Sequence, residues 1–345
     1  MPDRPTLESL AAELGVSRQT VSNVINRPER VAPATLERVR AAVEAAGYVP
    51  TLAARQLRTA RSHALAFRLM PTFDGINGHI LDAFLHELAD HARRAGYSLA
   101  LFSAEDEDDE METYERMVAA RSIDGVVLTS THLDDPRPDR LLALGIPFVS
   151  FGRPWSVTAD PFDAPFDWVD VDGAAGTEAV TRRLVEEGHR RIGYISWPLE
   201  PGVGCDRWDG WRRAVDDSGL ATEELAVYCP DGADQGRQAA HTLLARGATA
   251  LVCASDTLAL GAARAVSDLG GGRVVVGFDN TPVARELSLN SVVQPVAEAA
   301  RTALGLLLRR IDGDQESRHV LLPPTPVFRD RTLSGLTAEP EHHQR

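Results

Sequence analysis

The sequence predicts an all-α helix-turn-helix head joined to an α/β body of two doubly wound, parallel-sheet subdomains with a cleft between them. Three observations support this fold class. The chain has 345 residues, and an ordinary domain has roughly 100 to 200, so we expect two or three domains. Apolar residues recur at helical spacing within residues 1–50. From residue 62 onward, apolar strand-like runs alternate with helical stretches, which is typical of βαβ units and parallel sheets.

The composition is that of an ordinary globular protein. Hydrophobic residues make up 43% and charged residues 25% of the chain, and no apolar run reaches the roughly 18 residues that a membrane span needs. The first residues, MPDRPTLESL, lack the basic stretch and apolar core of a secretory signal. Cys205, Cys229 and Cys253 are odd in number and widely spaced, which favours reduced thiols over a disulfide. We therefore expect a cytoplasmic protein.

Charge is distributed unevenly along the chain. The formal net charge is −14, whereas residues 1–61 hold nine arginines against six acidic residues. The rest of the chain is strongly acidic. A basic head on an acidic body is typical of a protein that presents only one end to DNA.

Residues 1–50 carry the start and stop signals of three short helices. Thr6 is a candidate N-cap for a first helix that ends at Gly15, because glycine adopts the left-handed conformation that stops a helix. Ser17 is the candidate N-cap of a second helix, and Pro33 opens a third that Gly47 closes. Two short helices joined by a glycine-containing turn form a helix-turn-helix. The apolar faces are Leu7, Leu10, Ala11 and Leu14, then Val21, Val24 and Ile25, then Leu36, Val39 and Val43.

The second of these helices has a polar face turned away from the predicted core, with Arg18, Gln19, Ser22 and Asn23. In the major groove, arginine pairs with guanine, and glutamine or asparagine pairs with adenine. This face therefore has the side chains for reading DNA. The alternative is a solvated face on a small helical domain, and the helix pattern alone leaves both interpretations open.

Three segments resemble the LacI family of bacterial transcriptional regulators, which have a helix-turn-helix head and a periplasmic-binding-protein-like effector domain. They are TLESLAAELGVSRQTVSNVIN, VAPATLERVRAAVEAAGYVP and AARQLR, and the resemblance continues through most of the chain. Asn23 stands where the family more often has arginine, which leaves the operator half-site open. The resemblance implies base reading by Arg18, Gln19 and Asn23, and phosphate contacts or helix capping by Thr6, Ser17, Thr20, Ser22 and Asn26.

Residues 51–61, TLAARQLRTAR, form a short basic segment after Pro50. A segment of this length has marginal helicity by itself. The resemblance implies a hinge that becomes helical on DNA, where Leu57 wedges into the minor groove and kinks the duplex. It places Ala54 one turn before this leucine, and Arg55 and Arg58 near phosphates. The alternative is a flexible linker with an incidental leucine.

The predicted effector-binding and dimerisation body spans residues 62–335 and is followed by a polar, disordered tail at 336–345. Its strand candidates are ALAFRLM, SLALFS, GVVLTS, PFVSFG, WVDVD, RIGYIS, ALVCAS and VVVGF. The body is too long for one sheet of this kind, so we expect two similar halves, as in type I periplasmic sugar-binding proteins. We place the N-subdomain at about 62–166 and 297–324, and the C-subdomain at about 167–296 and 325–335.

Doubly wound sheets bind ligands beyond the C-terminal ends of their strands. Polar residues at those ends are therefore candidate ligand contacts, and they include Ser130, Arg153, Ser196, Ser255, Asp256 and Asp279. Helix capping is the alternative for each of them. We prefer capping for Asp256 and for Asp172, which precedes a helix that opens with GAAG.

The resemblance assigns several residues to an effector site. RWDGW matches the family's Arg-x-x-Gly motif, which makes Arg207 an effector clamp, and VVVGFDN matches a signature that makes Asp279 an acceptor for ligand hydroxyls or amines. His79 lies where the family often has an aromatic residue. Two tryptophans, Trp155 and Trp208, are expected either to stack on a sugar face or only to pack. The expected site comprises His79, Arg153, Trp155, Arg207, Trp208, Ser255, Asp279 and Gln294.

The segment EDEDDEMETYER at residues 105–116 is strongly acidic. Acidic residues suit the N-terminus of a helix, so a solvated helix start is the preferred interpretation. A metal or partner role is the alternative. Elsewhere the sequence predicts no metal site and no cofactor.

Three function classes compete for a chain with such a cleft. An enzyme is disfavoured because the chain has no G-x-S-x-G elbow, Walker A loop, H-E-x-x-H or paired-cysteine zinc motif. A solute-binding protein needs a signal peptide and no DNA-binding head. We therefore expect a repressor of carbohydrate-metabolism genes that binds a near-palindromic operator as a homodimer. The expected effector is a sugar that releases the operator, with a purine-like corepressor as the alternative.

Overall fold

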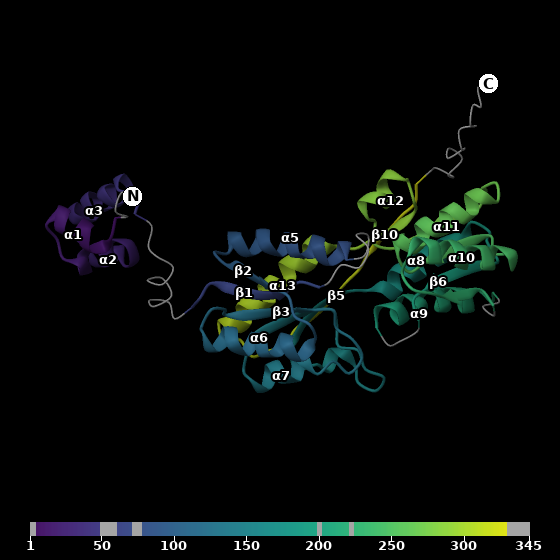
Figure 1. Ribbon diagram of the computed structural model, residues 1–345, viewed down its shortest axis with the longest axis horizontal. Helices are drawn as coiled ribbons and strands as arrows, with labels where there is room; N and C mark the ends of the chain where they lie inside the picture. The colour runs from purple at the N-terminus through teal and green to yellow at the C-terminus, as the bar shows by residue number, and fades with distance from the viewer. Residues whose placement is uncertain (1–4, 49–60, 71–77, 199–201, 221–223, 330–345) are drawn as a thin grey trace, which may run out of the picture. The chain divides into compact units, whose positions relative to one another are not determined.

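The computed structural model describes residues 5–48, 61–70, 78–198, 202–220 and 224–329 (Figure 1). The hinge residues Ala54, Arg55, Leu57 and Arg58 and the tail at 336–345 lie outside the described residues. The chain divides into two compact units, residues 1–62 and residues 63–345. We call these units the head and the body and describe each by itself.

The predicted helix-turn-helix of the head is confirmed. Thr6 forms a capping box with Ser9, and the helix that follows ends at Gly15, whose φ of 62° is left-handed. The hydroxyl of Ser17 caps the second helix by accepting a hydrogen bond from the Thr20 backbone N–H. The elements are α1 (Leu7–Leu14), α2 (Arg18–Asn26), the 3₁₀ helix η1 (Pro28–Arg30) and α3 (Pro33–Ala45).

Apolar side chains from all three α-helices form the core of the head, as the sequence spacing predicts. Val21 and Val39 are fully buried, and Leu10, Ala11 and Val24 are nearly so. The partly buried side chains packed against them include Leu7, Leu14, Ile25, Leu36 and Val43.

The body consists of two α/β lobes. The first lobe has a six-stranded sheet with the order β11-β5-β4-β3-β1-β2, and all neighbouring strands are parallel. The inner strands are buried, whereas the two edge strands of the sheet are partly exposed. The strands are β1 (Ala64–Arg68), β2 (Ser98–Phe102), β3 (Gly125–Thr129), β4 (Phe148–Phe151), β5 (Asp167–Val171) and β11 (His319–Leu322).

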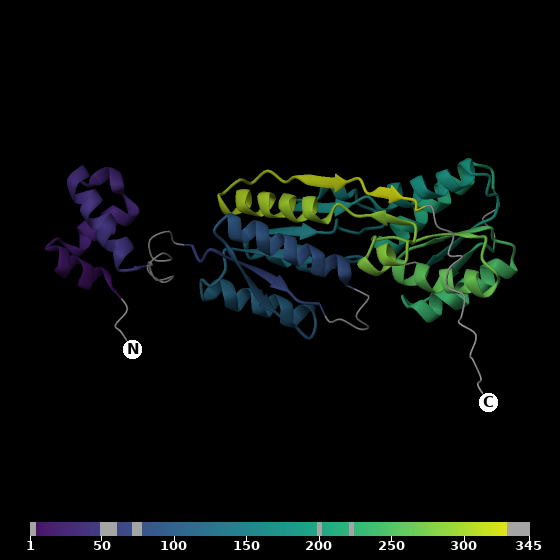
Figure 2. The ribbon, with the colours of Figure 1, turned by 90° about the horizontal axis from the view of Figure 1, so that it is seen from above.

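Helices cover both faces of this sheet. They are α5 (His79–Arg94), α6 (Glu107–Ala119), α7 (Arg137–Ala143) and α13 (Val296–Ile311). Leu65 and Phe67 of β1 pack with α5 and α13, whereas Ala66 between them packs with α6 and α7. This alternation is the two-residue period of a strand. Figure 2 shows α13 beside α5, although the two helices are far apart in the sequence.

The second lobe repeats this plan around a four-stranded parallel sheet with the order β7-β6-β8-β9. Two helix pairs flank the sheet, and α8 packs with α9 while α10 packs with α11. The strands are β6 (Ile192–Ser196), β7 (Ala226–Tyr228), β8 (Ala250–Cys253) and β9 (Val274–Val276). The helices are α8 (Gly173–Glu186), α9 (Val203–Asp217), α10 (Ala233–Ala245), α11 (Asp256–Asp268) and α12 (Pro282–Glu286).

The chain passes between the lobes after β5, after β10 (Ser291–Val293) and after β11, and β12 (Thr325–Val327) pairs antiparallel with β10. We expected the strand at residues 167–171 to begin the second lobe. That boundary is wrong, because β5 pairs with β4 and β11 in the first lobe. The first crossover therefore follows Val171.

Cys205, Cys229 and Cys253 are free cysteines. We expected buried thiols, and Cys253 is buried, whereas Cys205 and Cys229 are only half-buried. Among the helices of the described residues, none is both long enough and apolar enough to cross a membrane.

Candidate functional site

The candidate DNA-reading face lies on α2, where Arg18 and Gln19 are exposed. Arg18 NH1 lies 3.4 Å from Glu8 Oε1, and the two side chains are 68% and 76% exposed. An ion pair this exposed contributes little, so the guanidinium can exchange its partner for DNA at small cost. Gln19 Nε2 donates to Asn23 Oδ1 at 3.0 Å, so two of the predicted base-reading side chains lie together.

The residues expected to contact phosphate or to cap helices have separate outcomes. Capping is confirmed for Thr6 and Ser17, and Ser17 Oγ lies 2.8 Å from Thr20 Oγ1. Ser22 is half-buried on α2. The side chain of Asn26 lies outside the described part of the structure. Contacts with phosphate stay a prediction for all of them.

The body holds a cavity of about 300 Å³ at the C-terminal ends of strands from both lobes. Six of the eight predicted effector-site residues line it: His79, Arg153, Trp155, Arg207, Asp279 and Gln294. The first lobe also contributes Ser130, Thr131 and Asp170, and the second contributes Trp197, Asp206, Asp231 and Phe278. The strand-end rule therefore found the position of the cavity.

Arg207 of α9 is the centre of a buried cluster. Its NH2 donates to Asp279 Oδ1 at 3.3 Å, and Gln294 Nε2 donates to the same oxygen at 2.6 Å. Its NH1 donates to the Ala254 carbonyl, and its guanidinium carbon lies 3.8 Å from the ring centroid of Phe278. Arg207, Asp279 and Gln294, which we predicted to bind an effector, thus lie together. They bind each other and also line the cavity.

Asp279 is held under electrostatic and conformational constraint. Burial raises the pKa of its carboxyl group, while the Arg207 charge and the Gln294 hydrogen bond lower it. Its φ of 103° lies in the left-handed region that side-chain-bearing residues rarely adopt. Such strain persists only where neighbours over-determine the conformation, so the cluster fixes the direction of this carboxylate.

Arg153, in the loop after β4, is held by a second group of carboxylates. Its Nε donates to Asp170 Oδ2 at 2.7 Å, and its NH2 donates to Asp206 Oδ2 at 3.0 Å. Its guanidinium carbon lies 4.8 Å from the Trp155 ring centroid, within the range of a cation–π interaction. Burial raises the pKa of Asp206 to about 6, although the Arg153 charge lowers it.

Trp155 and Trp197 bring aromatic faces to the cavity. The indole N–H of each is buried and has no hydrogen-bond partner among the described residues. Buried polar groups are hydrogen-bonded in the great majority of cases. Two buried indole donors without a partner in the described part of the chain therefore belong to residues that line this cavity.

Trp208 and Ser255 do not line the cavity, which corrects two of our predictions. Successive residues of a helix point about 100° apart, and Trp208 accordingly packs against the second-lobe core. Ser255 caps α11, and its hydroxyl donates to Asp231 Oδ1 at 2.6 Å. Ser255 therefore contacts a residue of the cavity lining, Asp231, without lining the cavity itself. Ser196 is buried outside the cavity lining as well.

The two aspartates assigned to capping have different outcomes. Asp172 caps α8 by accepting from the Ala175 N–H at 2.8 Å, as expected. The assignment is wrong for Asp256, because Ser255 is the N-cap of α11. The Asp256 carboxylate instead accepts from the Thr281 N–H and the Ser291 hydroxyl, each at 2.6 Å. It ties α11 to the segment that follows β9.

Sequence reasoning missed Asp206, Asp231, Trp197 and Phe278 in the cavity lining. The strand-end rule had the signal for two of them, because Trp197 directly follows β6 and Asp231 comes shortly after β7. Asp206 and Phe278 each precede a residue that the motifs did identify. Their partners lie far along the chain, so the sequence carries no sign of these contacts.

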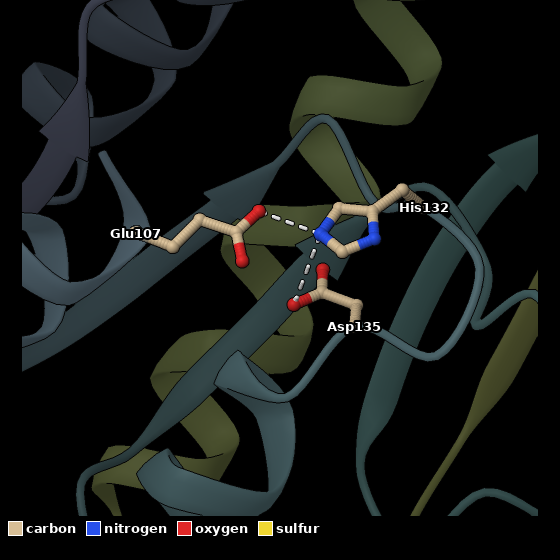
Figure 3. Close-up of side chains that lie close together, drawn as sticks. All are labelled: Glu107, His132 and Asp135. Atoms are coloured by element: carbon tan, nitrogen blue, oxygen red, sulfur yellow. Dashed lines mark hydrogen bonds and ion pairs between the residues drawn. The ribbon is translucent and has the colours of Figure 1, made fainter. Parts of the chain in front are cut away.

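A second polar cluster joins Glu107 of α6 to His132 and Asp135 of the loop between β3 and α7 (Figure 3). His132 Nε2 lies 2.6 Å from Glu107 Oε1 and 3.8 Å from Asp135 Oδ1, and its Nδ1 donates to the Leu133 carbonyl at 2.9 Å. Arg137 donates to both oxygens of Asp135, at 2.9 and 2.7 Å. These contacts favour an ion-pair network around a protonated His132 over a metal centre.

The acidic start of α6 is not wholly solvated, which corrects that expectation. Glu110 is 1% exposed. It accepts from Arg68 NH1 at 2.7 Å, from Arg137 NH1 at 2.9 Å and from the Tyr114 hydroxyl at 2.7 Å. Partners on several elements compensate the burial of this carboxylate. One acid of the run therefore belongs to the core of the first lobe.

These sites together define a class of protein. The head presents polar side chains on the second helix of a helix-turn-helix, and the body holds a cavity lined by charged and aromatic side chains of two lobes. A DNA-reading unit joined to a ligand-binding unit is a ligand-responsive transcriptional regulator.

Comparisons with known proteins identify the family. Residues 6–51 match the bacterial regulatory proteins of the lacI family, and residues 83–321 match the periplasmic binding proteins and sugar binding domain of the LacI family. The chain belongs to the LacI family of DNA-binding transcriptional regulators, whose members are regulators rather than enzymes.

Two relatives and one solved structure illustrate the similarity. The regulator CelR of Thermobifida fusca is 37% identical over 330 residues, which cover 90% of this chain and 93% of CelR. The repressor PurR of Pectobacterium carotovorum is 30% identical over 346 residues, which cover 96% of this chain and 97% of PurR. A structure of a CelR–cellobiose complex has a TM-score of 0.68 and 32% identity and covers 94% of this chain and 99% of its own.

Proposed function

We propose that this protein represses carbohydrate-metabolism genes and leaves its operator when a sugar occupies the cavity of the body. The observation that carries the proposal is the cavity lining, which combines Arg207, Asp279 and Gln294 with the aromatic faces of Trp155 and Trp197. Sugar hydroxyls both donate and accept, and this lining offers donors, an acceptor-only carboxylate and flat apolar surfaces. The 37% identity to CelR supports a carbohydrate effector.

The charges of the cavity favour an uncharged sugar. Among the described residues, its lining includes four carboxylates, from Asp170, Asp206, Asp231 and Asp279, but only two guanidinium groups, from Arg153 and Arg207. Each of these guanidinium groups already has a carboxylate partner. A phosphorylated sugar or another anion would meet uncompensated negative charge in a site of low dielectric constant.

The head supplies the DNA half of the mechanism. We infer a homodimer that places two α2 helices about one helical turn apart on a near-palindromic operator. Arg18, Gln19 and Asn23 read bases, and paired hinge segments with Leu57 bend the centre of the site. Because operator DNA lies in the bacterial cytoplasm, the proposal places the protein there.

Effector and operator are coupled through the arrangement of the lobes. The chain passes between the lobes at three places, and a ligand in the cavity contacts both lobes, so it can favour one relative position of the lobes over another. A ligand shifts such an equilibrium only as far as its affinities for the two arrangements differ. Release of the operator therefore requires that the sugar favour the arrangement of the lobes in which the two hinge segments of the dimer are spaced unfavourably for DNA binding.

A purine-like corepressor is the second candidate, and PurR at 30% identity is the observation that favours it. The aromatic faces of Trp155 and Trp197 also suit a flat heterocycle. This candidate reverses the sign of the response, because a corepressor strengthens operator binding.

Thermal unfolding and operator binding of the full chain test the proposal together. Cellobiose, glucose, adenine and guanine are compared, with DNA from the region upstream of the protein's own gene as the operator. A sugar that binds only the folded state raises Tm and weakens operator binding. A purine that raises Tm and strengthens operator binding would replace the proposal with the second candidate. If no sugar changes either quantity, the carbohydrate assignment is wrong.

A further inference from the structure

An ion pair joins the two lobes at the wall of the cavity. Arg153 follows β4 in the first lobe, and Asp206 lies on α9 in the second. Arg153 NH2 lies 3.0 Å from Asp206 Oδ2, and the side chains are 11% and 13% exposed. Both residues line the cavity. A bond between lobes at this place depends directly on how far apart the lobes stand.

The first lobe orients Arg153 independently of this bond. Its Nε is bound to Asp170 of β5, and its guanidinium lies over the ring of Trp155. NH2 also donates to the Val171 carbonyl at 3.4 Å. Arg153 therefore keeps its direction when Asp206 is removed, and a change at Asp206 tests the bond between the lobes rather than the loop after β4.

The second lobe is shaped around the carboxylate of Asp206. Its Oδ2 also accepts from the Ala174 N–H at 3.1 Å, at the beginning of α8, where the helix dipole favours a negative charge. At Gly173 a Cβ atom would lie 2.8 Å from the same oxygen. The first crossover, from β5 into α8, thus passes directly beside the ion pair.

We propose that Asp206 is a positioning residue that couples occupation of the cavity to the arrangement of the lobes, by holding Arg153 across the cavity wall. This rests on the proposed function, because the coupling it describes is that between effector and operator. The bond between Arg153 and Asp206 forms part of the cavity wall, so the fit of a ligand in the cavity depends on whether this bond is closed. The structure thus gives Asp206 a role distinct from that of Arg207, whose contacts with Asp279 stay within the second lobe.

A purely stabilising role fits the surroundings of Asp206 less well. Burial and the charges of Asp170 and Asp172 raise its pKa, and Arg153 and the Ala174 N–H lower it by less. An ionised carboxylate is costly in such a place, and apolar residues of similar volume are often as stabilising as a buried ion pair. A pair of opposite charges between two movable lobes instead favours the one arrangement of the lobes in which the two charged groups meet.

The test compares Asp206→Asn with Asp209→Asn in the full chain. Asp209 lies on the same helix three residues further on, is exposed and does not line the cavity, so it controls for loss of a carboxylate from α9. The effector probe is cellobiose. Two quantities are measured: the Kd of cellobiose by calorimetry, and the ratio of operator Kd values with and without saturating cellobiose.

We expect the operator ratio to fall at least about fivefold in Asp206→Asn, toward the lower end of typical allosteric coupling, while cellobiose still binds. Asp209→Asn should keep the parental ratio. An unchanged ratio in Asp206→Asn overturns the proposal. Loss of cellobiose binding to the degree found in Arg207→Ala also overturns it, because Asp206 would then be a ligand contact and not a coupling residue.

A measurement without ligand separates this inference from the proposed function. Hydrogen exchange of the amides at residues 171–174 reports on the crossover beside the ion pair. We expect faster exchange there in Asp206→Asn than in the parent or in Asp209→Asn, with partial rescue by Asp206→Glu. Parental exchange in Asp206→Asn overturns the inference even if cellobiose is not the effector. A parent that ignores cellobiose, with altered exchange in the variant, contradicts only the carbohydrate assignment.

Discussion

The guanidinium carbon of Arg207 lies 3.8 Å from the ring centroid of Phe278. Asp279, the next residue in the chain, binds the same guanidinium through its carboxylate. One strand end therefore holds Arg207 by a ring face and by a charge. Stacking fixes the plane of a guanidinium group, so the ring and the carboxylate together fix the position of Arg207 in the cavity wall.

Loss of this cluster should abolish the response to effector while operator binding persists. Hydrogen bonds to charged groups contribute about 1.5 to 3 kcal/mol. We therefore expect Arg207→Ala and Asp279→Asn each to weaken the effector roughly tenfold to over a hundredfold. Calorimetry with effector, beside operator binding without it, measures both effects. Since the two residues pair, a small loss of Tm is expected as well. Normal effector affinity in both variants would contradict the assignment.

Replacement of Arg18 should relax operator sequence preference. We expect Arg18→Ala to cost about 1 to 3 kcal/mol of operator binding and to lose the preference at one symmetric base pair. Selection of binding sites from a randomised library measures the preference. Glu8→Ala is the matched control, because it removes only the exposed partner of Arg18. A mutant that selects the parental consensus would rule out base reading by Arg18.

Leu57 lies in the expected hinge, outside the described residues, and its role stays a prediction. We expect Leu57→Ala to weaken specific operator binding and reduce DNA bending, because the side chain would no longer separate base pairs. Gel mobility of circularly permuted fragments measures the bend. The thermal unfolding of the body should not change. Equal bend and affinity in mutant and parent would favour the passive linker.

His132 should make stability depend on pH. Burial lowers the pKa of His132. The Leu133 carbonyl, Asp135 and Glu107 together raise this pKa by more, so the net shift is upward. A histidine whose pKa is raised by folding stabilises fully below its unfolded value of about 6.5, and this stabilisation is lost as pH rises through the folded pKa. We expect the fall in Tm between about pH 6 and about pH 8 to be smaller in His132→Gln.

The control for this measurement is His86→Gln, because the His86 side chain is 75% exposed on α5. This variant should keep the parental dependence on pH. The interpretation of the cluster in Figure 3 as a protonated network fails if His132→Gln also keeps it. Addition of zinc should leave the Tm of the parent unchanged, since Arg137 already binds both oxygens of Asp135.

Local sequence signals predicted the elements whose stability is local. The caps Thr6 and Ser17 and the stop at Gly15 identified the head helices, and the eight apolar runs each correspond to a strand of the body. The strand candidates did not include β7, β10, β11 and β12, which have three or four residues each. Pro326 within β12 also disfavours a strand in sequence, because proline cannot donate to a ladder.

Long-range partners account for what the sequence could not predict. The sequence predicts a strand at β5, but it does not show to which lobe the strand belongs. The pairing of β5 with β11 and β4 places it in the first lobe. Glu110 resembles its acidic neighbours until Arg68 and Arg137 approach it from other elements. In the cavity, Arg153 and Asp206 are 53 residues apart. Charge and periodicity locate such residues on elements but do not say which elements meet.

The order of strands in the first sheet has a consequence for synthesis on the ribosome. β11 pairs with β5, yet the four-stranded sheet of the second lobe and its helices lie between them in the sequence. While that lobe is being translated, β5 has an open edge, and an open edge is a template for pairing with other chains. The nascent protein thus carries an unfinished sheet while residues 172–318 are synthesised. Its final strand closes that edge only when translation has nearly ended, so aggregation competes with folding during this interval.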